Sequence, residues 1–224
     1  MSDRRLSRRT WVTTTVAAAA LIGMVGLAGC ASGTPRAERY VPPAMGASWS
    51  YRITSTGSFG SGSADVPMRV SQTEWQGRRL LRFENPSGAT LQDDRVGVVA
   101  VLDRNGRAVM SYEPALTYRW PLEVGRSWTE ELVLRVTSGS GAVQDLPMKT
   151  NWRVEAYEDV TVPAGTFKAW RVVMEDNFGF RQTTWSVPDT MGVFARRLSE
   201  RGPNHPQGGA GTQLMELLSV PAVR

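Results

Sequence analysis

The sequence predicts an all-β, antiparallel fold for the chain that follows an N-terminal leader. Apolar and polar residues alternate along many short segments, and clusters of Gly, Pro, Asn and Ser separate these segments. No segment after the leader repeats its apolar residues with the period of a helix. Such alternation is typical of a half-buried antiparallel sheet. We therefore expect two related β-meander halves that form one curved sheet, a half-barrel or a sandwich.

The first half, approximately residues 41–118, contains five expected strands. In the first of them, Trp49, Tyr51 and Ile53 alternate with polar neighbours, and a Gly/Ser turn follows. Asn105-Gly106 lies between two apolar runs, which is a strong hairpin signal. The strands are expected over residues 48–53, 66–71, 78–83, 96–102 and 108–112.

The second half, approximately residues 119–220, alternates more regularly, with one parity apolar and the other charged. The apolar set is Trp128, Leu134, Met148, Trp152 and Val154. The charged set is Arg135, Lys149, Arg153 and Glu155. Because successive side chains of a strand point to opposite faces, we expect the apolar set to face inward. The strands are expected over residues 128–136, 146–156, 159–162, 166–174, 180–187, 193–198 and 212–220.

The two halves contain an internal repeat. Residues 42–49 and 121–128 share Pro, Gly, Ser and Trp at four equivalent positions. Residues 65–69 and 145–149 share an Asp-x-Pro-Met pattern at nearly the same offset. The repeat predicts two related meanders around one core. Chance similarity between two β-rich segments is the alternative.

The leader has a positive start, at Arg4, Arg5, Arg8 and Arg9, and a short apolar core. It ends in Leu27-Ala28-Gly29-Cys30, which resembles the lipobox of bacterial lipoproteins. That resemblance implies cleavage between Gly29 and Cys30 and acylation of the Cys30 sulfur. An uncleaved transmembrane helix is the alternative, because residues 11–29 approach the ~20 residues that a span needs.

The resemblance also implies a place in the cell. A lipoprotein of this kind is anchored to the membrane through acylated Cys30 and faces the periplasm. Ala31 follows the cysteine, and the absence of aspartate there favours the outer over the inner membrane. Residues 7–12 resemble the twin-arginine export signal, although the two arginines also satisfy the charge rule of an ordinary signal peptide.

Three motifs of the second half resemble uncharacterised envelope proteins of Gram-negative bacteria. They are Pro-x-x-x-Gly-x-x-Trp at residues 121–128, Val-Pro-Ala-Gly-Thr-Phe at 162–167, and a Trp-x-x-Pro…Gly-x-Val pattern at 185–193. The last departs from the family pattern by one residue between Pro188 and Gly192. The resemblance implies a curved antiparallel sheet, like the open half-barrel of periplasmic lipoprotein carriers, and it brings no catalytic residue.

These boundaries give three parts: a lipoprotein signal peptide at 1–29, a tether at 30–40, and one all-β domain at 41–224. The chain has a net charge of +5, but the leader contributes +3 of it, so we expect no nucleic-acid partner. Cys30 is the only cysteine, so no internal disulfide can form, and the sequence contains no Cys/His metal cluster. We expect no cofactor and no metal.

Catalytic candidates are sparse, and we expect none. His205, the only histidine, lies in a breaker-rich loop without a neighbouring nucleophile. Asp103-Arg104-Asn105-Gly106 weakly resembles a calcium loop, but its later ligand positions are missing and a hairpin turn explains it.

Tryptophans are the more informative side chains. Trp152, Trp170 and Trp185 are candidates for the walls of a ligand cleft, and ordinary core packing is the alternative. The preferred interpretation is a lipid-anchored envelope protein that serves as a non-catalytic binding or structural module, with an envelope protein as its partner. The second is a carrier or sensor of a lipid-like or other amphiphilic ligand in a β half-barrel. An enzyme ranks last.

Overall fold

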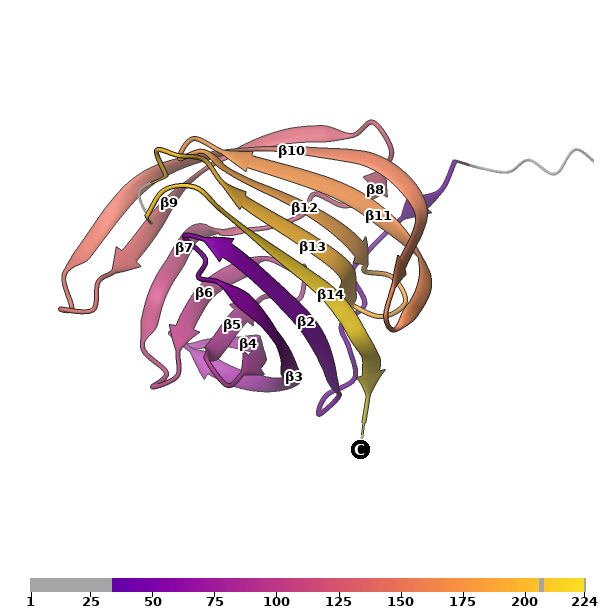
Figure 1. Ribbon diagram of the computed structural model, residues 1–224, viewed down its shortest axis with the longest axis horizontal. Helices are drawn as coiled ribbons and strands as arrows, with labels where there is room; N and C mark the ends of the chain where they lie inside the picture. Colours follow the sequence, from indigo (N-terminus) through magenta and orange to yellow (C-terminus); the bar gives the residue numbers. More distant parts are fainter. Residues whose placement is uncertain (1–33, 206–207, 224) are drawn as a thin grey trace, which may run out of the picture. The chain divides into compact units, whose positions relative to one another are not determined.

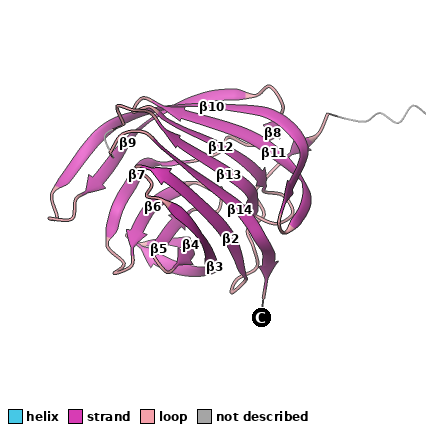
Figure 2. Ribbon diagram, in the orientation of Figure 1, coloured by secondary structure: helices cyan, strands magenta, loops and turns pink. Residues whose placement is uncertain are grey.

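The computed structural model describes residues 34–205 and 208–223, and every regular element in these ranges is a β-strand (Figure 2). The described residues belong to one compact unit. The predicted signal peptide and the lipidation site Cys30 lie outside the described residues. None of the described residues belongs to a helix with the length and apolar character needed to cross a membrane.

The described residues form fourteen strands in two sheets. The strands are β1 (Arg36–Ala37), β2 (Ser48–Gly57), β3 (Gly62–Trp75), β4 (Arg78–Asn85), β5 (Gly88–Gln92), β6 (Val98–Asp103), β7 (Ala108–Leu116), β8 (Leu122–Glu123), β9 (Ser127–Thr137), β10 (Val143–Val162), β11 (Gly165–Asp176), β12 (Phe180–Val187), β13 (Val193–Arg201) and β14 (Gly211–Ala222). β1 and β8 form a two-stranded sheet. The other twelve form a closed barrel (Figure 1).

The barrel confirms the all-β antiparallel prediction. It is a closed barrel, whereas the expected forms were a curved sheet, a half-barrel or a sandwich. Its strand order is β10-β11-β12-β13-β14-β2-β3-β4-β5-β6-β7-β9, and β9 pairs again with β10. Each expected meander therefore forms one continuous arc. Two seams join the arcs, β14 with β2 and β7 with β9. Closure gives hydrogen-bond partners to the backbone groups that the edges of an open sheet would expose.

The longest strand, β10, is built differently from its prediction. Two separate strands were expected over residues 146–156 and 159–162, whereas one strand of 20 residues covers both. A register shift places Val154 opposite Val172 but Ala156 opposite Arg171, so Glu155 is an extra residue. Such a bulge bends its strand without ending it. The curvature of β10 is visible in Figure 1.

The apolar residues that alternate along the second half pack in the interior of the barrel. The predicted inward set of five residues is buried, from Val154 at 0% exposed to Trp128 and Leu134 at 8%. Arg135, Lys149 and Arg153 keep more than half of their side chains exposed. Burying large apolar side chains supplies most of the driving force for folding, at ~25 cal/mol per Å² of apolar area.

The described part of the expected tether is packed against the domain. Arg36 and Ala37 pair with Glu123 and Leu122, and Ala37 is only 1% exposed. The buried phenol of Tyr40 donates a hydrogen bond to the Gly192 carbonyl at 2.8 Å. The folded domain therefore begins before residue 41, because Ala37 and Tyr40 of the expected tether are buried.

The first block of the predicted repeat has the same backbone geometry in both halves. Gly46 and Gly125 have φ values of +82° and +89°, which glycine tolerates better than other residues. The amide of Gly46 donates to the Val70 carbonyl, and the amide of Gly125 donates to the Val154 carbonyl. In both halves this block is a turn that leads into a long strand.

Two predicted turns have clear local causes. Val162 pairs with Gly165, so the Val-Pro-Ala-Gly motif is the hairpin turn between β10 and β11. The Asn105-Gly106 turn joins β6 to β7, and Gly106 has a φ of +81°. The Asp103 carboxylate accepts hydrogen bonds from the amides of Asn105 and Arg107. This carboxylate therefore stabilises a hairpin, as the sequence indicated.

Candidate functional site

Two of the three candidate cleft tryptophans belong to one apolar cluster. Trp152 and Trp170 are 6% and 1% exposed and pack with Val154, Val172 and other core residues. Trp152 stacks on Trp128 with ring centroids 5.4 Å apart, and its Nε1 donates to the Thr150 hydroxyl at 2.9 Å. Both rings therefore pack as core residues, the alternative that the sequence left open.

Trp185 lies apart from that pair. It is partly buried and packs against a different apolar cluster. Its Nε1 donates to Glu158 Oε1 at 2.9 Å, and the Arg196 guanidinium lies over its ring at 5.6 Å. Its cross-strand partners are Arg171 and Arg196. The structure thus holds Trp185 in a charged environment and does not bring it together with Trp152 and Trp170 as one cleft wall.

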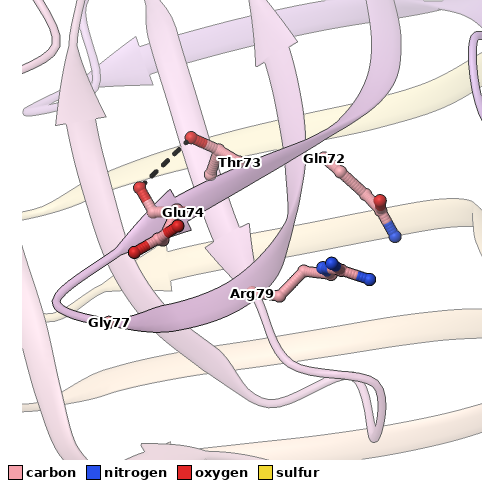
Figure 3. Close-up of a pocket in the computed structure, with 5 residues that line it drawn as sticks. All are labelled: Gln72, Thr73, Glu74, Gly77 and Arg79. Atoms are coloured by element: carbon pink, nitrogen blue, oxygen red, sulfur yellow. Dashed lines mark hydrogen bonds between the residues drawn. The ribbon is translucent and has the colours of Figure 1, made fainter.

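An open hollow of about 410 Å³ lies on the hairpin of β3 and β4 (Figure 3). Its lining residues are Gln72, Thr73, Glu74, Gly77 and Arg79. Figure 3 shows the Thr73 hydroxyl turned back to the Glu74 carbonyl, a weak contact of 3.5 Å. The lining is polar and exposed, so the hollow resembles a solvated hairpin face more than a ligand pocket, which is typically apolar and enclosed.

A more unusual group of side chains lies inside the barrel around Arg197. Arg197 of β13 is directly opposite Thr184 of β12, which in turn is opposite Val172 of β11. Directly paired residues share a face of the sheet. Since Val172 is a core residue, Arg197 and Thr184 also point to the interior. Thr184 is 2% exposed and its neighbour Ser186 is 7% exposed.

One aromatic ring contacts the Arg197 guanidinium, and two phenols act on its charge. Its Cζ lies 3.9 Å from the centroid of the Phe194 ring, and that ring stacks on Tyr51 at 4.4 Å. The Tyr51 phenol donates to the Phe194 carbonyl at 2.9 Å. Tyr118 is close enough for its charge state to be coupled to Arg197. Burial lowers the pKa of Arg197, while Tyr118 and Tyr51 act in the opposite direction.

The sequence offered no signal for this site. Arg196 and Arg197 are adjacent, so they point to opposite faces, and alternation alone does not say which one is inside. A register shift near Trp185 makes Ala195 an extra residue and thereby sets the parity of the two arginines. Arg196 forms an ion pair with Glu216 at 2.9 Å, whereas Arg197 takes the interior position.

The remaining candidate, His205, lies near aromatic and charged side chains. His205 lies 6.3 Å from the Phe180 ring. Its pKa is lowered by burial and by Arg201, against the effect of Asp176. The Asp176 carboxylate accepts hydrogen bonds from the amides of Phe178 and Phe180 in the turn before β12. Within residues 34–205 and 208–223, no group of His, Cys, Asp and Glu is placed to hold a metal ion.

The buried tyrosines make stability sensitive to alkaline pH. Burial raises the pKa of Tyr112 to about 12, and it also raises the pKa values of Tyr40 and Tyr51. The unfolded value is about 10. A raised folded pKa contributes stability that is fully present below the unfolded pKa and is lost as pH rises through the folded pKa.

We therefore expect unfolding above about pH 10 to accompany tyrosine ionisation. An alkaline titration followed by tyrosinate absorbance and by far-ultraviolet circular dichroism checks this. The two signals should change together for the buried tyrosines. Full ionisation near pH 10 with an unchanged β-sheet spectrum would contradict the burial of these phenols.

Comparisons with known proteins give structural likeness alone. No protein-family model matches the chain, and no curated protein matches it. A structure described as an exported protein with a YmcC-like fold, from Bacteroides fragilis, has a TM-score of 0.44 and 11% identity, over 82% of this chain and 99% of that chain. The hypothetical lipoprotein YmcC from Escherichia coli has a TM-score of 0.33 and 12% identity, over 79% of this chain and 86% of that chain.

Proposed function

We propose that this protein is a lipid-anchored protein of the cell envelope whose β-barrel serves as a non-catalytic binding or structural module. The observation that carries the proposal is Leu27-Ala28-Gly29-Cys30, which follows a positive start and an apolar run. Cleavage before Cys30 leaves the only cysteine of the chain as the first residue of the mature protein. Its sulfur then carries a diacylglycerol.

The anchor energetics favour permanent attachment. Each buried methylene contributes ~0.8 kcal/mol, and one acyl chain alone binds a membrane only marginally. Two chains on the sulfur of Cys30 bring the binding into the stable range. The barrel then faces the periplasm, and Ala31 after the cysteine favours the outer membrane.

Three carboxylates of the barrel accept hydrogen bonds from the protein itself, which supports a non-catalytic role. Asp103 and Asp176 accept backbone hydrogen bonds in turns. Glu158 accepts the Trp185 indole N–H. A catalytic base needs its proton-accepting atom free to face a substrate. These carboxylates instead face the protein's own donors.

The anchoring test is the substitution Cys30→Ser. We expect this variant to accumulate as an unprocessed precursor that incorporates no radioactive palmitate, because serine has no thiol to acylate. Ser32→Ala, two residues away and outside the motif, should process and label like the unmodified protein. Palmitate labelling of the Cys30→Ser protein would rule out the lipobox interpretation.

A carrier or sensor of an amphiphilic ligand is the second candidate. The observation that favours it is a cationic side chain, Arg197, inside the barrel and next to apolar clusters. A charged head group and an apolar tail need this combination of surfaces.

A further inference from the structure

We propose that Arg197 and Thr184 form a binding site for an oxyanion, a carboxylate or a phosphate group, in the interior of the barrel. The two residues are direct cross-strand partners on β13 and β12. Both carry buried polar atoms without a hydrogen-bond partner, Nε of Arg197 and the hydroxyl oxygen of Thr184. Two directly paired residues that each carry such an atom on one interior face are the observation on which the site rests.

The charge of Arg197 is not neutralised by the described part of the protein. No carboxylate of the described residues lies within ion-pair distance of its guanidinium, in contrast to Arg196 and Arg171. Its neighbours Tyr51 and Tyr118 are neutral phenols whose pKa values burial raises. The contact with the Phe194 ring recovers only part of the hydration that a buried guanidinium loses.

An oxyanion supplies the missing partner. Arginine remains protonated even when burial lowers its pKa, and its planar guanidinium matches a carboxylate or a phosphate through two parallel N–H donors. Because Nε makes no hydrogen bond in the described structure, the edge formed by Nε and Nη2 can take a bidentate anion. The Thr184 hydroxyl can donate a third hydrogen bond. Arg197 as a residue is partly exposed, but its Nε and the Thr184 hydroxyl oxygen have almost no accessible surface, so an anion reaches them only when neighbouring side chains move.

Two phenols and a serine complete the polar surroundings. Tyr118 lies close to the side chains of Thr184 and Ser186, which lower its pKa against the larger effect of burial. The Thr184 hydroxyl nevertheless lacks a partner at hydrogen-bond geometry. Tyr118 packs in the cluster of Trp152, and Phe194 packs against the cluster of Tyr51. The anion is therefore either free in solution or the head group of an amphiphile whose tail contacts these clusters.

This inference deepens the second candidate function and does not depend on acylation of Cys30. Binding is measured by isothermal titration calorimetry on the full chain in detergent micelles, at constant ionic strength, with inorganic phosphate, acetate and hexanoate as probes. Acetate and hexanoate share the carboxylate and differ in the apolar tail. Tighter binding of hexanoate identifies an amphiphile head group, whereas equal binding identifies a free anion.

Four variants locate the site. We expect Arg197→Gln to weaken anion binding by more than about tenfold and Arg197→Lys to weaken it less, because lysine keeps the charge and loses the bidentate geometry. Thr184→Val removes one donor at nearly constant volume and should weaken binding severalfold. Arg196→Gln removes the same charge from the neighbouring residue, which pairs with Glu216, and should leave binding unchanged.

Two results would overturn the proposal. One is the absence of saturable binding of all three anions to the unmodified protein. The other is undiminished binding in Arg197→Gln, or in Thr184→Val and Arg197→Lys if the glutamine variant does not fold. Loss of palmitate labelling in Cys30→Ser with intact anion binding would separate this site from the anchor. Palmitate labelling of the unmodified protein without saturable anion binding would retain the anchor and overturn the site.

Discussion

Replacing Trp152 with alanine is expected to lower the free energy of unfolding by ~3–5 kcal/mol. The indole is 6% exposed, stacks on Trp128 and contacts the edge of Tyr118, with both centroid distances at 5.4 Å. Its removal leaves a large cavity between these rings. It also removes the donor that satisfies the Thr150 hydroxyl, and Thr150 is fully buried.

Urea denaturation followed by circular dichroism measures this effect, and Trp185→Ala is the control. Trp185 is only partly buried, so its loss should cost less than that of Trp152. A small loss at Trp152, together with binding of a hydrophobic dye by the unmodified protein that this variant loses, would instead make the indole a cleft wall. That outcome would restore the cleft that the sequence proposed.

Gly192→Ala should be a strongly damaging change to a turn, with an expected loss of about 2–4 kcal/mol. Gly192 has a φ of +66°, and a left-handed conformation costs an alanine ~1–2 kcal/mol. A Cβ atom there would also lie 2.3 Å from the Val41 carbonyl oxygen and 2.8 Å from the Pro43 nitrogen. These are backbone neighbours, so the segment around residues 40–43 has to shift away.

Gly106→Ala separates the two contributions. Gly106 has a φ of +81°, and nothing lies within 4 Å of the position of its Cβ, so only the conformational cost applies. The same urea titration applied to both variants should show the larger loss at Gly192. Equal losses would mean that the close approach of Val41 and Pro43 contributes nothing.

Much of the fold follows from local sequence, and its closure does not. Alternation along residues 128–136 and 146–156 identified the inward face because the opposite parity is charged at Arg135, Lys149 and Arg153. The turn at Asn105-Gly106 was equally clear, since glycine there adopts a positive φ. Closure depends instead on the pairing of β14 with β2, and no local pattern encodes which distant strand an edge will meet.

The candidate site contains features that alternation along a strand cannot predict. A tryptophan is compatible with both a core and a cleft, so the sequence could name Trp152 and Trp170 without deciding between them. The interior position of Arg197 depends on the extra residue Ala195, and a bulge of one residue leaves no clear mark in the alternation. The sequence did not predict the packing of Ala37 and Tyr40, because two isolated apolar residues among Gly and Pro residues are also typical of a linker.

The seam between β2 and β14 has a consequence for the order of folding. The hydroxyls of Thr56 and Thr212 are 2.7 Å apart across this seam although they are separated by 156 positions in the chain. Pairing across such a separation forms slowly, because a long loop must be closed first. Until β14 is available, β2 has an unpaired edge that can recruit another chain. An incomplete chain therefore presents this edge until β14 has been synthesised and has paired with β2.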